Sequence, residues 1–206
     1  MRRRENAIVA GFATLLVITA TASGASSRVA LERSPSGNPS LQTYLSMMSW
    51  PMRQSVLHAQ TLSDRTIDWI HGGDPPVLRE IAQACRKLRE VEARRGVLRV
   101  AAPEALNAKH RTMARAYSNA STGCKSIRST ALAVDAALER AALSGNAADQ
   151  SAAAKAVARS RALFLEFRRT TVRRFLESVD SWRAATLRYA AAIGAPVPLW
   201  LKSLGR

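Results

Sequence analysis

Few residues in this chain belong to the types that bind metals or carry out catalysis. The 206 residues include two cysteines and three histidines. The histidines, His58, His71 and His110, stand on separate segments, and none has a Glu or another His one helical turn away in a ligand pattern. The sequence also lacks a glycine-rich phosphate loop and a serine in a nucleophile elbow. We therefore expect no metal, no cofactor and no enzymatic activity.

Acidic side chains are scarce relative to basic ones. The chain has 15 Asp and Glu residues against 31 Lys and Arg residues, which gives a formal net charge of +16 at pH 7. A field of that sign attracts anionic partners such as phospholipid headgroups, wall polymers or nucleic acids. Nucleic acid is the least expected of these, because the aromatic side chains of the last long helix lie opposite its arginines and form no stacking platform.

Strand-like alternation of apolar and polar residues is absent, and apolar residues recur instead at steps of three and four. The sequence therefore predicts an all-α fold, an antiparallel bundle of about four helices. The expected helices are Ser40 to Ile70 with a kink or break at Pro51, Pro76 to about Val100, Pro103 to about Leu143, and a last helix capped by Asn146 or Asp149 that runs to about Ile193. The bundle domain would be residues 41–193, between a flexible linker at 26–40 and a short apolar tail at 194–206.

The first 25 residues have the order of a secretory signal: "MRRR", an uncharged apolar run, and then small residues. Cleavage after Ala22 and cleavage after Ala25 fit equally well. An uncleaved membrane anchor at residues 7–22 is the alternative, although the strongly apolar part is shorter than the roughly 20 residues of a spanning helix. We expect a protein that is secreted or located in the cell envelope. Loss of residues 1–25 removes three arginines and one glutamate, which leaves a net charge of +14.

Two long apolar seams are visible in the sequence. The first has steps of four and three throughout, which is a heptad pattern, and comprises Leu106, His110, Met113, Tyr117, Ala120, Cys124, Ile127, Ala131, Val134, Leu138 and Ala141. The second carries five of the chain's eleven Phe, Trp and Tyr residues, and comprises Val157, Ser160, Phe164, Phe167, Thr171, Phe175, Val179, Trp182, Thr186, Tyr189 and Ile193.

The two cysteines, Cys85 and Cys124, favour an inter-helix disulfide, since export would place an even number of thiols where disulfides persist. Two separate buried thiols are the alternative. A disulfide needs Cα atoms about 5.5 to 6 Å apart. If the second helix ended at Arg95, Cys85 would lie about 15 Å from its end and Cys124 about 30 Å into the next helix. We therefore expect the second helix to continue through Gly96 to about Val100.

The stretch "FRRTTVRRFLESVDSW", residues 167–182, is the strongest candidate for a functional surface. Arg169 and Arg173 share a side of the helix with acidic residues, so we expect them to have intrahelical partners. The candidate anion-binding residues lack such partners along the helix or lie near its seam, and they are Arg161, Arg168, Arg174, Arg183 and Arg188. The alternative is an ordinary basic face in contact with solvent.

Two further groups of residues have competing interpretations. Trp200 and Lys202 in "PLWLK" either dock on the bundle or lie in a membrane interface. Asp135 and Glu139 stand one helical turn apart, where Arg128 and Arg140 could pair with them on a solvated face. We expect the docked tail and the solvated face.

The segment from 76 to 143 contains "REIAQACRKLREVEA" followed by "YSNASTGCKSIRSTALAVDAALERA". It resembles the two-cysteine helical hairpins of uncharacterised exported actinobacterial proteins. The resemblance covers about a third of the chain. It implies export and a bridged bundle, and it brings no activity with it.

These observations lead to two functional hypotheses. In the first, the protein is a non-enzymatic interaction or scaffold module of the envelope or the secreted fraction, with an unknown protein partner. In the second, its basic helix faces bind membrane headgroups or anionic wall polymers. If the N-terminal segment is not cleaved, that segment would also attach the protein to a membrane.

Overall fold

The computed structural model describes residues 39–96 and 99–205. The expected signal or anchor, and all but the last two residues of the expected linker, lie outside these ranges. In the described part, every regular element is helical, which confirms the all-α fold. The elements are α1 (Leu41–Ile70), α2 (Pro76–Arg95), α3 (Glu104–Ser144), α4 (Ala147–Phe167), the π-helical turn η2 (Arg168–Val172), α5 (Arg173–Ala192) and α6 (Leu199–Ser203).

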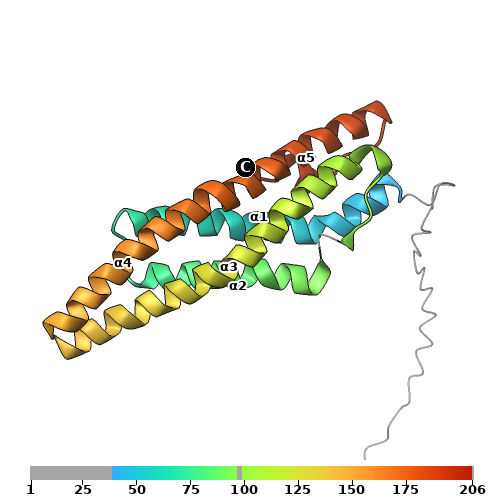
Figure 1. The fold of residues 1–206 in the computed structure, drawn as a ribbon. Coiled ribbons are helices and arrows are strands. Elements are labelled where there is room, and N and C mark those ends of the chain that lie inside the picture. The colour runs from blue at the N-terminus through green and yellow to red at the C-terminus, as the bar shows by residue number, and fades with distance from the viewer. Residues whose placement is uncertain (1–38, 97–98, 206) are drawn as a thin grey trace, which may run out of the picture. The chain divides into compact units, whose positions relative to one another are not determined.

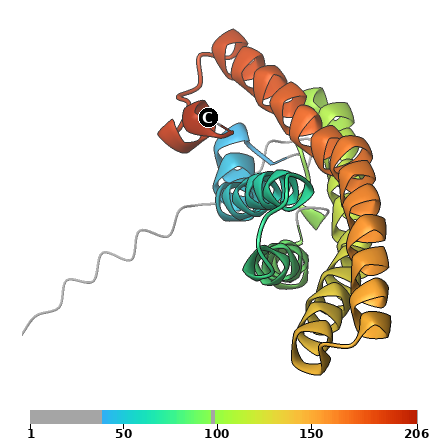
Figure 2. The same ribbon diagram turned by 90° about the vertical axis from the view of Figure 1, so that its left-hand side faces the viewer.

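The long helices form an antiparallel bundle in which α4, η2 and α5 are one continuous rod (Figure 1). Helix α3 packs against α2 on one side and against α4 and α5 on the other, and α1 packs against α2, α4 and α5. The connections between successive long helices are short, so sequence neighbours run in opposite directions. The turned view shows the α3–α4 hairpin continuing past the end of α1 and the start of α2 (Figure 2).

Local sequence explains most helix boundaries. Ser40 caps α1, since its Oγ accepts a hydrogen bond from the Thr43 N–H at 3.2 Å. Asn146 caps α4 in the same way through the Asp149 N–H at 2.8 Å. Helix α3 ends at Ser144, and its C-cap, Gly145, has a φ of 64° that suits glycine. Pro51 lies buried inside α1, and the helix continues through it without a break.

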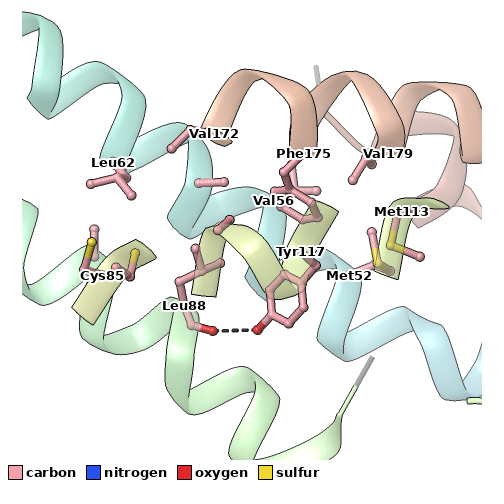
Figure 3. Packing of buried hydrophobic residues seen from close by; sticks show 14 of the residues in the cluster. Met52, Val56, Leu62, Cys85, Leu88, Met113, Tyr117, Val172, Phe175 and Val179 are labelled. Carbon is pink, nitrogen blue, oxygen red and sulfur yellow. Dashed lines mark hydrogen bonds between the residues drawn. The ribbon is translucent and has the colours of Figure 1, made fainter. Parts of the chain in front are cut away.

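The core joins side chains from all four long segments. Met52, Val56 and Leu62 of α1 meet residues of α2, α3, η2 and α5 (Figure 3). The Tyr117 hydroxyl donates to the Leu88 carbonyl at 2.6 Å and so satisfies its only buried donor. The predicted seam of α3 is buried from Leu106 to Val134 and is half-buried beyond that point.

Helix α3 and the α4–η2–α5 rod approach each other closely at Gly123. At Gly123 an added Cβ would overlap the ring of Phe167, so only glycine permits this approach of the two helices.

The seam of the rod differs from the prediction at the π turn and near its C-terminal end, where Ala190 is buried in place of Tyr189. Val172 is buried where Thr171 was expected, and the Arg173 N–H donates to the Arg168 carbonyl, five residues back. Phe167 and Phe175 are eight residues apart, which in an α-helix leaves them about 80° apart around the axis. The π turn accommodates the extra residue and returns Phe175 to the core. At the far end Ile193 is half exposed, because α5 ends at Ala192.

The prediction that the second helix continues past Gly96 is wrong: α2 ends at Arg95. The side chains of Cys85 and Cys124 nevertheless lie 2.6 Å apart, and both are fully buried. Residues 96–103 form a connection of eight residues rather than a tight turn. Cys85 lies about 15 Å from the end of α2, and Cys124 lies about 30 Å from the start of α3, so the two helices must be shifted by about 15 Å along their axes. A chain of eight residues can reach up to about 26 Å, which is enough for that shift.

Candidate anion-binding pocket

The five candidate arginines do not form one site in the structure. The Arg161 guanidinium lies 5.5 Å from the centroid of the Trp69 ring, and Arg168 Nε donates to Ser63 Oγ at 3.0 Å. Both arginines therefore face α1. Arg174 and Arg188 are exposed. Among the neighbouring arginines, Arg173 forms the expected intrahelical pair, with Glu177 at 2.7 Å.

Arg183 holds the C-terminal segment against the bundle. Its Nε donates to the Leu201 carbonyl at 2.9 Å and its Nη2 to the Lys202 carbonyl at 2.7 Å. These are carbonyls near the end of α6, which have no partner within the helix. Both hydrogen bonds are charge-assisted, so they hold α6 firmly. They also use two of the guanidinium donors, so fewer remain for an external anion.

Trp200 and its neighbours dock on the bundle. Helix α6 packs against α1, Leu201 and Leu204 are buried, and Trp200 is partly buried against the core. The Lys202 side chain is exposed. Sequence reasoning treated residues 194–206 as a tail, because a five-residue helix without periodicity gives no clear pattern.

A pocket of about 180 Å³ lies between α1 and α2. Its lining residues are Trp50, Gln54 and His58 from α1, and Lys87, Glu90, Val91 and Arg94 from α2. On each helix these residues recur at steps of three or four, so each set forms one stripe along its helix. The two stripes face each other across an antiparallel pair, which brings the side chains together.

The pocket has an excess of positive charge. Lys87 and Arg94 are exposed cations, and the Glu90 carboxylate is 3.7 Å from Arg86 on the same helix. Burial lowers the pKa of His58, and the Lys87 ammonium lowers that pKa further, while Glu90 acts in the opposite direction. The imidazole is therefore neutral at pH 7 and presents one N–H donor.

This arrangement suits a small anion. Lys87 and Arg94 supply charged donors, and the Gln54 amide and the His58 N–H supply neutral ones. The volume is below the roughly 300 to 1,000 Å³ of pockets for drug-sized molecules, so a carboxylate or phosphate group fits better than a whole cofactor. Sequence reasoning missed the site because its residues come from two helices. The spacing of Lys87 and Arg94, two turns apart, was the only visible signal.

The remaining polar groups of interest are structural. Trp182 Nε1 donates to the Tyr44 hydroxyl at 2.8 Å, and that hydroxyl donates to His110 Nδ1 at 2.9 Å. All three side chains are buried in the core, out of reach of a ligand. Asp135 and Glu139 pair with Arg79 of α2, at 2.7 and 2.5 Å, and not with the arginines of their own helix.

Across residues 39–96 and 99–205, the structure brings together no group of three or more His, Cys, Asp or Glu side chains able to hold a metal ion. None of the helices in those ranges has the length and hydropathy needed to cross a bilayer. In comparisons with known proteins, no family model, curated protein or solved structure matches the chain.

Proposed function

We propose that this protein is an exported, non-enzymatic helical bundle that binds anionic groups of the cell envelope through the α1–α2 pocket. The single observation that carries the proposal is the convergence of Lys87, Arg94 and His58 in one small hollow. The positive net charge of the chain supports it, because a field of that sign concentrates anions near the surface. Phospholipid headgroups and the phosphates of wall polymers have the required charge and size.

Export and a disulfide form part of the same proposal. The charged, apolar and small residues at the N-terminus support export, as does the resemblance to exported two-cysteine hairpins. The 2.6 Å approach of Cys85 and Cys124 supports a bridge in the mature protein. The intact mass of the natively produced protein tests both points, since cleavage near Ala22 or Ala25 and loss of two hydrogens each change that mass.

Binding to phosphatidylglycerol vesicles tests the pocket. The double variant Lys87→Gln/Arg94→Gln should bind at least about tenfold more weakly than wild type, because it loses two charge-assisted contacts. The matched control is Arg111→Gln/Arg115→Gln, which removes the same charge from exposed positions of α3. Equal losses in both variants would mean that the overall field binds the vesicles and that the pocket has no special role.

An interaction or scaffold module is the second candidate function. Leu57 and Leu199 are 52% and 81% exposed, and Leu57 lines a hollow of about 240 Å³ with Trp200 of α6. Exposed apolar side chains around a hollow are typical of protein interfaces. Salt separates the two functions: at 0.5 M ionic strength charges are screened beyond about 4 Å, so anion binding is lost while an apolar contact with a partner survives.

A further inference from the structure

The α3–α4 hairpin leaves an apolar face uncovered. Trp69, next to the end of α1, donates to Ser160 at 3.0 Å, and Arg79 near the start of α2 pairs with Asp135. Beyond these contacts the hairpin continues without α1 and α2 beside it (Figures 1 and 2). The inner faces of α3 and α4 remain apolar there, with Leu138 and Val157 only half-buried.

This face forms a groove of about 430 Å³. Its lining includes Leu138 and Ala141 of α3, and Ala154, Val157 and Arg161 of α4. The volume falls within the range of small-molecule sites, roughly 300 to 1,000 Å³. The groove is therefore large enough for a small molecule with a single alkyl chain.

Arg161 gives the groove its one charge. Its guanidinium lies over the Trp69 ring, which holds the planar group by a cation–π contact. Its Nε is shielded from solvent and has no hydrogen-bond partner among the described residues. A buried donor without an acceptor is unfavourable, and an anionic oxygen bound at this end of the groove would relieve that cost.

We infer that the groove binds one free, single-chain anionic amphiphile of the fatty carboxylate class. The alkyl chain would lie on the alanine, leucine and valine side chains, and the carboxylate would accept hydrogen bonds from Arg161. The inference goes beyond the anion pocket, since it concerns other helices and a ligand that is mostly apolar.

Calorimetric titration of the purified full-length protein with dodecanoate below its micellar concentration tests the inference. One molecule should bind per chain. Arg161→Gln should weaken binding about tenfold or more, because a charge-assisted contact is lost. Arg159→Gln removes the same charge from an exposed position on the same helix, and it should change the affinity less than about twofold. Dodecyltrimethylammonium, which has the opposite charge, should not bind.

A second variant tests the groove itself. Ala154→Trp places a large side chain in the groove at an exposed position, so it should abolish dodecanoate binding while circular dichroism shows unchanged helix content. The Lys87→Gln/Arg94→Gln variant should bind dodecanoate like wild type, which separates this site from the anion pocket. Equal effects of Arg159→Gln and Arg161→Gln, wild-type binding by Ala154→Trp, or binding to anionic vesicles without binding of monomeric dodecanoate would each overturn the inference.

Discussion

His110 lies in the core, where its Nδ1 accepts a hydrogen bond from the Tyr44 hydroxyl. Burial lowers the pKa of His110, and it also lowers that of His58 at the rim of the α1–α2 pocket. In the unfolded chain both imidazoles titrate near their ordinary pKa of about 6.5. The unfolded state therefore binds more protons than the folded state once the pH falls below that value.

The free energy of unfolding should decrease as the pH falls below about 6.5, by up to about 1.4 kcal/mol per pH unit for each of these histidines. Above about 6.5 both states leave the imidazoles neutral, so this stability is fully present there. Urea denaturation at pH 7.5 and at pH 5.5 measures the difference.

The variant His110→Asn isolates one residue's share of that difference. The Asn side-chain oxygen can still accept from Tyr44, but it cannot be protonated. The loss of stability between the two pH values should therefore be smaller in this variant. The comparison is needed because burial raises the pKa of Glu92, which acts in the opposite direction. An unchanged loss in His110→Asn would show that His110 stays uncharged in both states or is charged in both.

At the scale of the element, the π turn at Arg168–Val172 determines whether the C-terminal half of the rod faces the core. The buried positions Phe167 and Val172 are five residues apart, whereas buried positions elsewhere along the rod follow steps of three and four. One additional residue in an α-helix would rotate everything after it by about 100°. The π turn accommodates that residue, so Phe175, Val179 and Trp182 stay buried.

Deletion of Thr170 should convert the π turn into ordinary α-helix and leave the bundle folded. Without that residue, the core positions after Phe167 return to steps of four and three, so no rotation is needed. The melting temperature should stay within a few degrees of wild type or rise, and circular dichroism with thermal melting measures it.

Deletion of Ala184 is the matched control. Ala184 is an exposed residue of α5, where there is no π turn to compensate. The deletion should rotate the residues that follow it, including Thr186 and Ala190, out of the core and lower the melting temperature clearly. Similar behaviour of the two deletion variants would contradict the role given to the π turn.

At the scale of the whole molecule, the proposed bridge between Cys85 and Cys124 would tie α2 to α3 near the middle of the bundle. It would close a loop of about 40 residues, which stabilises the folded state by about 4 kcal/mol in the chain-entropy model. Both cysteines are fully buried, so external thiols would reach the bridge only slowly in the folded protein.

Reduction of the exported protein should lower its melting temperature by about 10 °C while preserving its helix content at low temperature. The double variant Cys85→Ala/Cys124→Ala is the control, since its melting temperature should not respond to the reductant. If the exported protein is denatured without a reductant and two free thiols are then titrated, that result would contradict the bridge.

Local and periodic features of the fold could be predicted from the sequence. The seam of α3 from Leu106 to Val134 followed from its heptad spacing, because a helix repeats every 3.6 residues wherever it packs. The proline and glycine signals located the helix boundaries near Ile70 and Ser144 for the same local reason.

Features that depend on two segments together were decided only by the tertiary structure. The pairing of Arg79 with Asp135, the capping of α6 by Arg183 and the pocket between Lys87 and His58 join residues far apart in sequence. Their formation depends on the relative shift and rotation of neighbouring helices. A connection such as residues 96–103 leaves that shift free, because the distance it spans depends on its conformation and not only on its length. The sequence therefore determined which faces are apolar, and packing determined which polar side chains meet.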